Sequence, residues 1–286
     1  MGWEEFLALW CGVWAVLALA GYGMALAGVT KTQRMVRYTG RIEQVRMPRH
    51  GGSRTGGISV VISYRDATSG QEVTVTNGGE RGDVITSAWE GREIGVSHPR
   101  GRPHAYRLST TPEEPSRGLG RPTLALFLVY CGLAALAAVG WGWPWALIGV
   151  GGPLAVFAAG HLPGTVRAKN HRIEKLAAMD TVHGRIIAVL EDVTVDQDNG
   201  TSTTITPVVS FTTHKGTAVT AHCTSHLPDP AGSYGHDVTV HYAPGDLADF
   251  TLDRAAERRG QKLDVVINAL AVVVFLATAA MGMALL

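Results

Sequence analysis

The sequence predicts an α+β membrane protein with four transmembrane helices and two duplicated small all-β domains, open barrels or sandwich-like, in the cytoplasm. Three observations support this prediction. Only 17% of the 286 residues are charged, whereas a soluble protein carries about a quarter. All 25 Lys and Arg residues lie between residues 31 and 121 or between residues 167 and 262, and these two stretches resemble each other. One soluble globule, a disordered chain and a long coiled coil are therefore excluded.

Apolar segments near both ends of the sequence are long enough to cross a membrane, which requires about 20 residues. They are residues 6–29 and 264–286, the first and fourth predicted helices. Residues 1–5, an external N-terminus, contain Glu4 and Glu5 but no Lys or Arg. A secretory signal peptide begins with positive charge. We therefore expect the first segment to be retained as a transmembrane helix rather than cleaved.

Residues 122–160 contain no charged residue and are too many for one transmembrane helix. As a single helix they would extend about 60 Å, at about 1.5 Å per residue. The Trp-Gly-Trp-Pro segment at 141–144 offers a break, because Gly and Pro end helices and Trp favours the membrane interface. We predict transmembrane helices at 122–140 and 145–162, joined by an external turn at 141–144.

Basic residues flank the predicted helices on one side only, and such flanks stay in the cytoplasm. They are Lys31, Arg34, Arg37, Arg117, Arg121, Arg167, Lys169, Arg172, Lys175, Arg254, Arg258, Arg259 and Lys262. Both termini are therefore predicted outside, and two β-domains with their juxtamembrane linkers, residues 30–121 and 163–263, in the cytoplasm. The excess of Arg over Lys, with abundant Ala and Gly, indicates a high-GC bacterial genome and hence a bacterial inner membrane.

The predicted helices contain no ionisable residue apart from His161 and Asp264 at their boundaries. Ionisable residues inside membrane helices mark ion and proton pathways, so the sequence does not favour a transporter. Pro153 is interpreted as a kink rather than a gate. Small residues are expected to allow close helix packing: Gly21, Ala25, Gly149, Gly152, Ala155 and Ala159.

The two soluble pieces repeat each other at a spacing of 144 residues near their starts and ends. Gly40-Arg41-Ile42 corresponds to Gly184-Arg185-Ile186, and Ile94-Gly95-Val96 corresponds to Val238-Thr239-Val240. Such self-similarity is the signature of a repeated architecture. The whole chain then consists of two copies of a unit formed by a helix, a soluble piece and a second helix.

Each soluble piece has the alternating apolar pattern of short β-strands. Ile58, Val60, Ile62 and Tyr64 alternate with more polar residues, and Val73 and Val75 continue on a second strand. In the other piece strands are predicted at 205–211 and 219–223 and around Val238, Val240 and Tyr242. The segments 47–57 and 191–204 are predicted to be loops.

These motifs resemble a family of bacterial membrane proteins called domain of unknown function 3592. The shared pattern is Gly-x-Ile/Val, an apolar strand ending in an aromatic, Gly, a Val-rich strand, and Val-x-Val-x-Tyr before Pro. It appears as Gly184-Arg185-Ile186, Val208 to Phe211, Gly216, Val219, Val238 to Tyr242 and Pro244. The first copy departs from it, with Ser97-His98-Pro99 where Tyr-x-Pro is expected. The resemblance implies a membrane-tethered β-domain with no established reaction and assigns no site residues.

One candidate metal site is His222, Cys223 and His226, because zinc takes His and Cys ligands. Adjacent residues on a strand face opposite sides, so His222 and Cys223 would share an ion only at a bend. We therefore interpret these residues, and the nearby His214, His236 and His241, as surface or loop residues. Cys11 and Cys131 lie in apolar segments and are expected to act as small hydrophobic residues.

Two further segments superficially resemble ligand sites. The glycine-rich segment 50–57 lacks the Gly-Lys-Ser/Thr ending of a phosphate-binding loop and is interpreted as a hairpin connection. The acidic residues Glu191, Asp192, Asp196 and Asp198 are interpreted as a solvated run rather than a calcium site. No catalytic, cofactor-binding or metal-binding residue is therefore predicted, and no cofactor.

The two soluble pieces differ in charge: residues 30–121 carry a net charge of +6 and residues 163–264 carry −3. We hypothesise that the two β-domains lie side by side and pair partly by charge. Apart from the lipid bilayer, the expected partner is a protein or a second copy of the chain; no aromatic-interleaved basic stripe supports nucleic-acid binding, and no small-molecule substrate is identified.

The predicted function is that of a non-enzymatic, membrane-tethered scaffold or interaction protein. Two alternatives remain open. The first is an accessory subunit of a transporter or channel, which a polar face in the packed helices would favour. The second is a membrane-bound metal-dependent enzyme that uses His222, Cys223 and His226.

Overall fold

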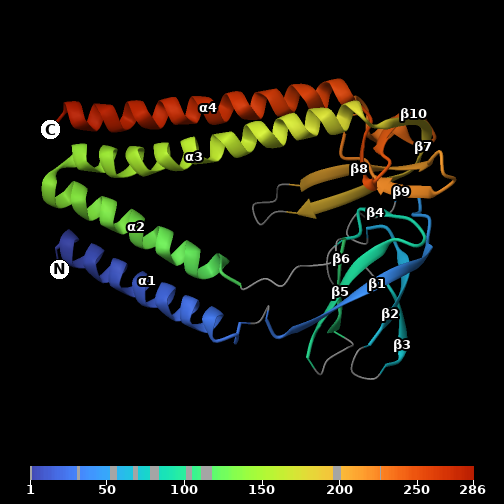
Figure 1. Cartoon of the computed structure of the whole chain (residues 1–286), viewed down its shortest axis with the longest axis horizontal. Coiled ribbons are helices and arrows are strands. Elements are labelled where there is room, and N and C mark those ends of the chain that lie inside the picture. Colours follow the sequence, from blue (N-terminus) through green and yellow to red (C-terminus); the bar gives the residue numbers. More distant parts are fainter. Residues whose placement is uncertain are drawn as a thin grey trace. The chain divides into compact units, whose positions relative to one another are not determined.

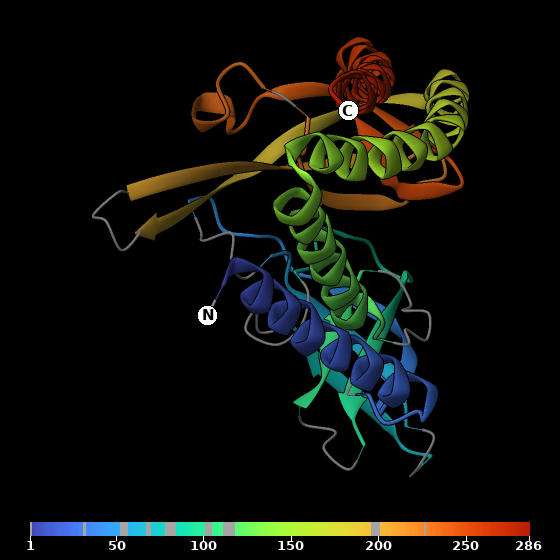
Figure 2. The ribbon, with the colours of Figure 1, turned by 90° about the vertical axis from the view of Figure 1, so that its left-hand side faces the viewer.

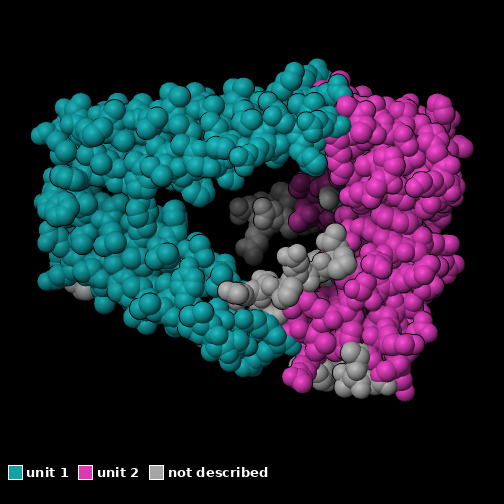
Figure 3. All heavy atoms as spheres, in the orientation of Figure 1, with its two compact units in different colours: residues 1–34, 115–174, 258–286 teal, residues 35–114, 175–257 magenta. Residues whose placement is uncertain are grey.

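The computed structural model describes residues 2–30, 33–51, 57–66, 70–77, 84–100, 105–110, 118–195, 201–225 and 227–286. The chain divides into two compact units, shown in different colours in Figure 3. Unit 1 comprises Met1–Arg34, Pro115–Glu174 and Arg258–Leu286, and unit 2 comprises Met35–Glu114 and Lys175–Glu257. Unit 1 is helical, and unit 2 contains both β-sheets (Figure 1).

In the described part of the chain, four α-helices are long and apolar enough to cross a membrane, as the sequence predicts. They are α1 (Trp3–Leu26), α2 (Gly120–Trp141), α3 (Trp143–Ala177) and α4 (Arg254–Ala284). Only Gly142, with a positive φ of 99°, separates α2 from α3. Glycine tolerates this backbone conformation, which explains the position of the predicted hairpin.

Helices α3 and α4 extend well beyond the predicted transmembrane segments, which ended at residue 162 and began at residue 264. The extensions are rich in Ala, Arg, Lys and Glu, which favour helix. At the start of α4, Asp253 Oδ1 accepts hydrogen bonds from the backbone N–H groups of Ala255 and Ala256 at 2.8 and 2.9 Å, which caps the helix. Hydropathy alone detects only the apolar part of such helices.

Small residues bring the helices together in pairs. A Cβ added at Gly132 of α2 would lie 2.5 Å from Sγ of Cys11 in α1, and one at Gly21 would lie 2.9 Å from Cβ of Pro122. In the other pair, a Cβ at Gly151 of α3 would lie 2.8 Å from the backbone nitrogen of Ala279. Gly21 was expected to serve packing, whereas Gly132 and Gly151 were not singled out. Gly152 was also expected to serve packing, but a Cβ added there would have no atom within 4 Å.

The first sheet has the order β3-β2-β1-β5-β6 with antiparallel pairing throughout. Its strands are β1 (Met35–Val45), β2 (Val60–Arg65), β3 (Glu72–Thr76), β5 (Glu93–Pro99) and β6 (Arg107–Ser109). Val60, Ile62 and Tyr64 are buried while their neighbours are not, which confirms the predicted alternation. The Tyr106 hydroxyl donates to the Thr76 carbonyl at 3.0 Å, so the two edges approach each other and the sheet forms a nearly closed barrel.

The second sheet has the order β11-β10-β7-β8-β9-β4. Its strands are β7 (Asp180–Val195), β8 (Thr201–Thr212), β9 (Ala218–His222), β10 (Asp237–Ala243) and β11 (Asp246–Thr251), together with β4 (Ser87–Ala88). A short 3-10 helix, Ala231–Ser233, precedes β10. Phe211 and Tyr242 are central to its core, with ring centroids 5.7 Å apart.

The predicted loop at 191–204 is wrong, because Glu191–Val195 belongs to β7 and Thr201–Thr204 to β8. Residue pairs from Glu191–Ile205 to Val195–Thr201 form a two-stranded ribbon, and β9 joins β8 only from Val208 onward. The ribbon runs out from the rest of the sheet in Figure 2. The β-branched Val and Thr residues of the ribbon favour strands, although they face solvent. The sequence analysis predicted a loop because the segment is polar.

The two sheets share their arrangement strand by strand. The strands correspond in chain order: β1 to β7, β2 to β8, β3 to β9, β5 to β10 and β6 to β11. Corresponding strands have the same neighbours in the two sheets, except that β4 is added beside β9 in the second. Both long first strands contain a register shift at the same place, after Ile42 and after Ile186. Gly91 and Gly235, both with positive φ, donate to the carbonyls of Ile42 and Ile186 at 2.8 and 2.9 Å.

One core position differs between the sheets. His98 occupies the place in β5 that Tyr242 occupies in β10, because their strands pair in the same register with β1 and β7. His98 is 5% exposed, and its ring stacks on that of Tyr38 with centroids 5.3 Å apart. The first sheet thus has a histidine ring at the buried position where the second sheet has a tyrosine ring.

Candidate functional site

The two sheets of unit 2 are joined by a strand that crosses from one to the other. Ser87 and Ala88 of β4 pair with Ala221 and Thr220 of β9, and the His222 N–H donates to the Thr86 carbonyl at 2.7 Å. An edge strand has a row of backbone groups ready to pair with another chain. Residues 86–88 of the first β-domain occupy that edge in the second.

Trp89 continues from β4 into the second β-domain and packs against its core cluster. The guanidinium carbon of Arg92 lies 4.5 Å from the centroid of the Trp89 ring, a cation–π contact. Arg92 also donates to Ser87 Oγ at 2.9 Å and to the Thr110 carbonyl at 2.8 Å. Arg92 therefore holds β4 and Trp89 in place from the side of the first β-domain.

Two opposite charges, those of Arg92 and Asp246, interact at this junction. Arg92 is only 8% exposed, and burial lowers the pKa of its guanidinium, while the negative charge of Asp246 in the second β-domain acts in the opposite direction. Arg92 comes from the piece with net positive charge and Asp246 from the piece with net negative charge. Besides this charge, the two β-domains are connected by the backbone pairing of β4 with β9 and by the apolar packing of Trp89.

The glycine-rich segment 50–57 makes a further contact at this junction. The ring of His50 stacks on that of Tyr234 with centroids 3.8 Å apart, and the Gly51 N–H donates to the Val189 carbonyl at 2.8 Å. Residues 52–56 lie outside the described part of the chain. The described part of the segment therefore contacts the second β-domain, a role that its sequence did not suggest.

His222 and Cys223, interpreted as surface or loop residues, are instead buried, with 3% and 7% exposure. Every residue of β9 after Ala218 is buried, and β4 pairs with its outer edge at Thr220 and Ala221. Burial raises the pKa of the Cys223 thiol, and Sγ contacts the Ser225 carbonyl at 3.6 Å. A protonated, buried thiol is a poor metal ligand and a poor nucleophile.

Another histidine of the same domain, His241, makes separate contacts. Burial, and secondly the positive charge of Arg254, lower the pKa of His241, whose Nδ1 lies 3.0 Å from Thr181 Oγ1. His226, Asp196 and Asp198 lie outside the described residues. Within the described ranges, no three His, Cys, Asp or Glu side chains are placed to hold a metal ion.

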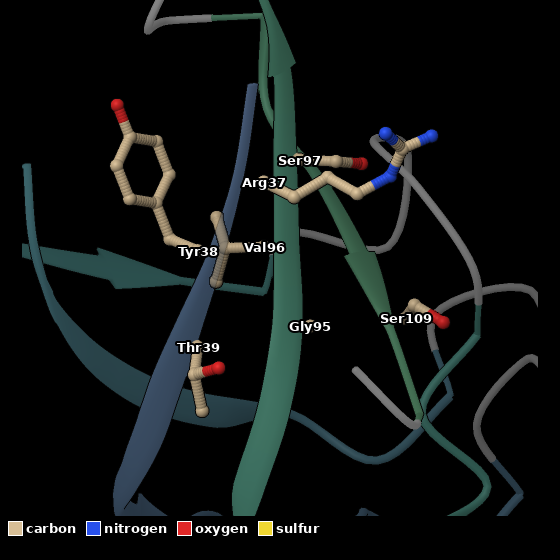
Figure 4. Close-up of a pocket in the computed structure, with 7 residues that line it drawn as sticks. All are labelled: Arg37, Tyr38, Thr39, Gly95, Val96, Ser97 and Ser109. Carbon is tan, nitrogen blue, oxygen red and sulfur yellow. The ribbon is translucent and has the colours of Figure 1, made fainter. Parts of the chain in front are cut away.

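A small polar pocket of about 100 Å³ lies on the first sheet (Figure 4). Arg37 pairs with Ser97 across β1 and β5, and Gly95 pairs with Thr39 on one side and with Ser109 on the other. Because Gly95 has no side chain, a depression remains between its neighbours. Arg37, Ser97 and Ser109 point to one side of β5, and Tyr38 points to the other.

A guanidinium beside hydroxyl groups is a donor set that suits a small anion. Ligand sites for organic molecules, however, usually measure about 300–1,000 Å³, and this pocket is smaller. Sequence reasoning identified Arg37 only as a basic residue that flanks a helix, and it did not connect Ser97 or Ser109 with Arg37. The signal that could have identified the pocket is the set of polar residues spaced two apart around Gly95.

Comparison of the chain with protein-family models, with curated proteins and with solved structures found no match. The junction between the two sheets and the pocket around Gly95 are therefore interpreted from their geometry alone. Of the two, the junction has the larger set of specific contacts, and it determines how the two β-domains present their surfaces.

Proposed function

We propose that this chain is a multi-pass protein of the bacterial inner membrane whose two β-domains form one interaction platform in the cytoplasm. The observation that supports this role best is the crossing of β4 and Trp89 from the first β-domain into the second. Two independent domains would need only a linker between them. A shared sheet and core instead fix the two surfaces in one arrangement, as a scaffold requires.

We further propose that the chain arose by duplication of one unit, as in two tandem copies of domain of unknown function 3592. The matching strand orders, register shifts and positive-φ glycines support this origin. Among the residues that the structure describes, only the first copy contributes a strand to the other sheet. The copies have thus diverged into donor and acceptor of β4, which makes the joined pair asymmetric.

The proposed orientation predicts the location of reporter domains fused to the chain. The basic flanks favour both termini outside and both β-domains in the cytoplasm. A phosphatase reporter, active only outside the cytoplasm, is expected to be active after Leu286 and inactive after Ser109. A fluorescent protein that matures only in the cytoplasm should give the reverse pattern. Cytoplasmic signal at Leu286 would contradict the proposed orientation.

The scaffold role is tested by crosslinking the full chain to its neighbours in native membranes. A photo-crosslinking residue is placed at Val193, which is 53% exposed on the ribbon of β7 and β8. We expect a discrete crosslinked protein that is lost in Trp89→Ala and kept in Glu90→Ala, a variant of the exposed neighbour. Crosslinks that are the same in both variants, or none at all, would argue against a platform that depends on the junction.

A further inference from the structure

An apolar groove of about 530 Å³ lies in unit 1 where the C-terminal end of α1 meets the N-terminal end of α2. Its walls include Gly21 and Met24 of α1, Val29, and Pro122 of α2. Met24 and Val29 are 53% and 43% exposed. The volume of the groove is many times the volume that one water molecule occupies in the liquid, about 30 Å³. The groove offers few polar partners for water.

The shape of the groove follows from close contact at one point along the helix pair. Gly21 and Pro122 approach so closely that a Cβ at Gly21 would lie 2.9 Å from Cβ of Pro122. Next to this contact, the Tyr22 hydroxyl and Thr123 Oγ1 lie 3.3 Å apart. Gly118 and Gly120, which have no side chains, leave the opposite wall open. The groove is therefore a consequence of small residues around a fixed point of contact.

The polar end of the groove is basic. Arg121 and Thr30 line it, and the chain after α1 folds back so that the Thr30 hydroxyl donates to Gln33 Oε1 at 2.6 Å. Gln33 Nε2 in turn donates to the Ala25 carbonyl at 3.0 Å, and the Arg34 N–H donates to the Thr30 carbonyl at 3.2 Å. Arg34 is exposed. The described residues of the turn and of the first turn of α2 include no acidic side chain.

We propose that this groove binds one anionic phospholipid, with an acyl chain against Met24, Val29 and the Gly21–Pro122 contact and with the phosphate at Arg121. A phospholipid is chosen as the occupant because of the position of the groove between apolar helices, and an anionic one because of the charge of Arg121. The groove lies between helices long and apolar enough to cross a membrane, so hydrocarbon is the medium that it meets. Anionic lipids are attracted to basic residues at the cytoplasmic surface by about 1 kcal/mol per Lys or Arg, and Arg121 lies at the end of the apolar walls.

The experiment uses the full chain purified in detergent. Phosphatidylglycerol and phosphatidylcholine with identical acyl chains are added in equal amounts, and the lipid retained by the protein is measured by native mass spectrometry. We expect the wild type to retain phosphatidylglycerol with about fivefold preference, which is the ratio that corresponds to about 1 kcal/mol. Inorganic phosphate in excess should leave the retained lipid in place, because the acyl chain supplies much of the binding.

Three variants separate the charged contact from the apolar one. Arg121→Gln is expected to remove the preference between the two lipids, and Arg121→Lys to restore most of it. Met24→Trp, which fills the groove, should lower the retention of both lipids without changing their ratio. Arg258→Gln removes an exposed basic residue that does not line the groove and serves as the matched control, with the wild-type preference retained.

A preference that survives in Arg121→Gln, or that disappears equally in Arg258→Gln, would overturn the proposal. Displacement of the lipid by inorganic phosphate would overturn it as well, because the occupant would then be a soluble anion. The circular dichroism spectrum of each variant in detergent distinguishes lost binding from lost folding. The proposal requires that the helices lie in a bilayer but is independent of the scaffold role, whose test uses crosslinking at Val193.

Discussion

Replacement of Trp89 by alanine is expected to destabilise the second sheet by about 2 to 3 kcal/mol, although Trp89 belongs to the first β-domain. Truncation of a buried tryptophan usually costs about 3 to 5 kcal/mol, and Trp89 is only half-buried where it packs against the second core. The cation–π contact with Arg92 is lost at the same time, which leaves that buried guanidinium with fewer partners. The loss should therefore affect both sheets together.

Pulse proteolysis of the full chain in detergent, over a urea series, measures this effect. Fragments from residues 180–251 should appear at a lower urea concentration in Trp89→Ala than in the wild type. Glu90→Ala changes the exposed neighbour and is expected to leave the transition unchanged. If the second sheet unfolds at the same urea concentration in Trp89→Ala and in the wild type, the junction does not stabilise it.

A single added methyl group at Gly40 or Gly184 is expected to cost about 1 to 3 kcal/mol at either position. A Cβ at Gly40 would lie 2.7 Å from Cγ2 of Ile62, and one at Gly184 would lie 2.8 Å from Cγ2 of Val240. Overpacking of a dense core forces side chains out of their rotamers and shifts the backbone, at a cost of this size. Backbone oxygens lie 3.3 and 3.1 Å away, those of Ser63 and Ser210, so the neighbours have little room to move.

The variants Gly40→Ala and Gly184→Ala are compared with Gly245→Ala, whose added Cβ would meet no atom within 4 Å. Urea unfolding of the full chain should show a loss for the first two and none for the third. The expected losses at Gly40 and Gly184 are of similar size because the two positions have equivalent neighbours in the two sheets. A neutral result at one of them would show that the equivalent positions are packed differently.

Much of the architecture could be predicted because its signals are local. Charge-free runs of about 20 residues locate the helices, and the alternation around Val60, Ile62 and Tyr64 locates a strand. Gly142 could be identified as a helix break from its own chemistry and that of its Trp and Pro neighbours. In each case the deciding residues lie within a few positions of one another. The orientation and the scaffold role stay predictions, which the reporter fusions and the crosslinking at Val193 test.

The remaining features depend on contacts between distant parts of the chain. β4 has only two residues, and it is a strand because β9, more than 130 residues later, offers an unpaired edge. His222, at the end of β9, and the following Cys223 are buried, although polarity had suggested the surface. The pocket around Gly95 likewise needs Arg37, Ser97 and Ser109 from three strands. Pattern and composition report a residue's own preferences, and they do not identify which distant segment will cover it.

The sequence by itself determined the four apolar helices and the strands with regular alternation. Only the tertiary structure decided that β4 and Trp89 join the two sheets, that the ribbon of β7 and β8 is paired to its end, and that the helix pair α1–α2 encloses an apolar groove. The physical reason is the range of the interactions. Hydropathy and backbone preference act over one or two turns, whereas edge pairing, core packing and grooves arise when surfaces far apart in the chain meet.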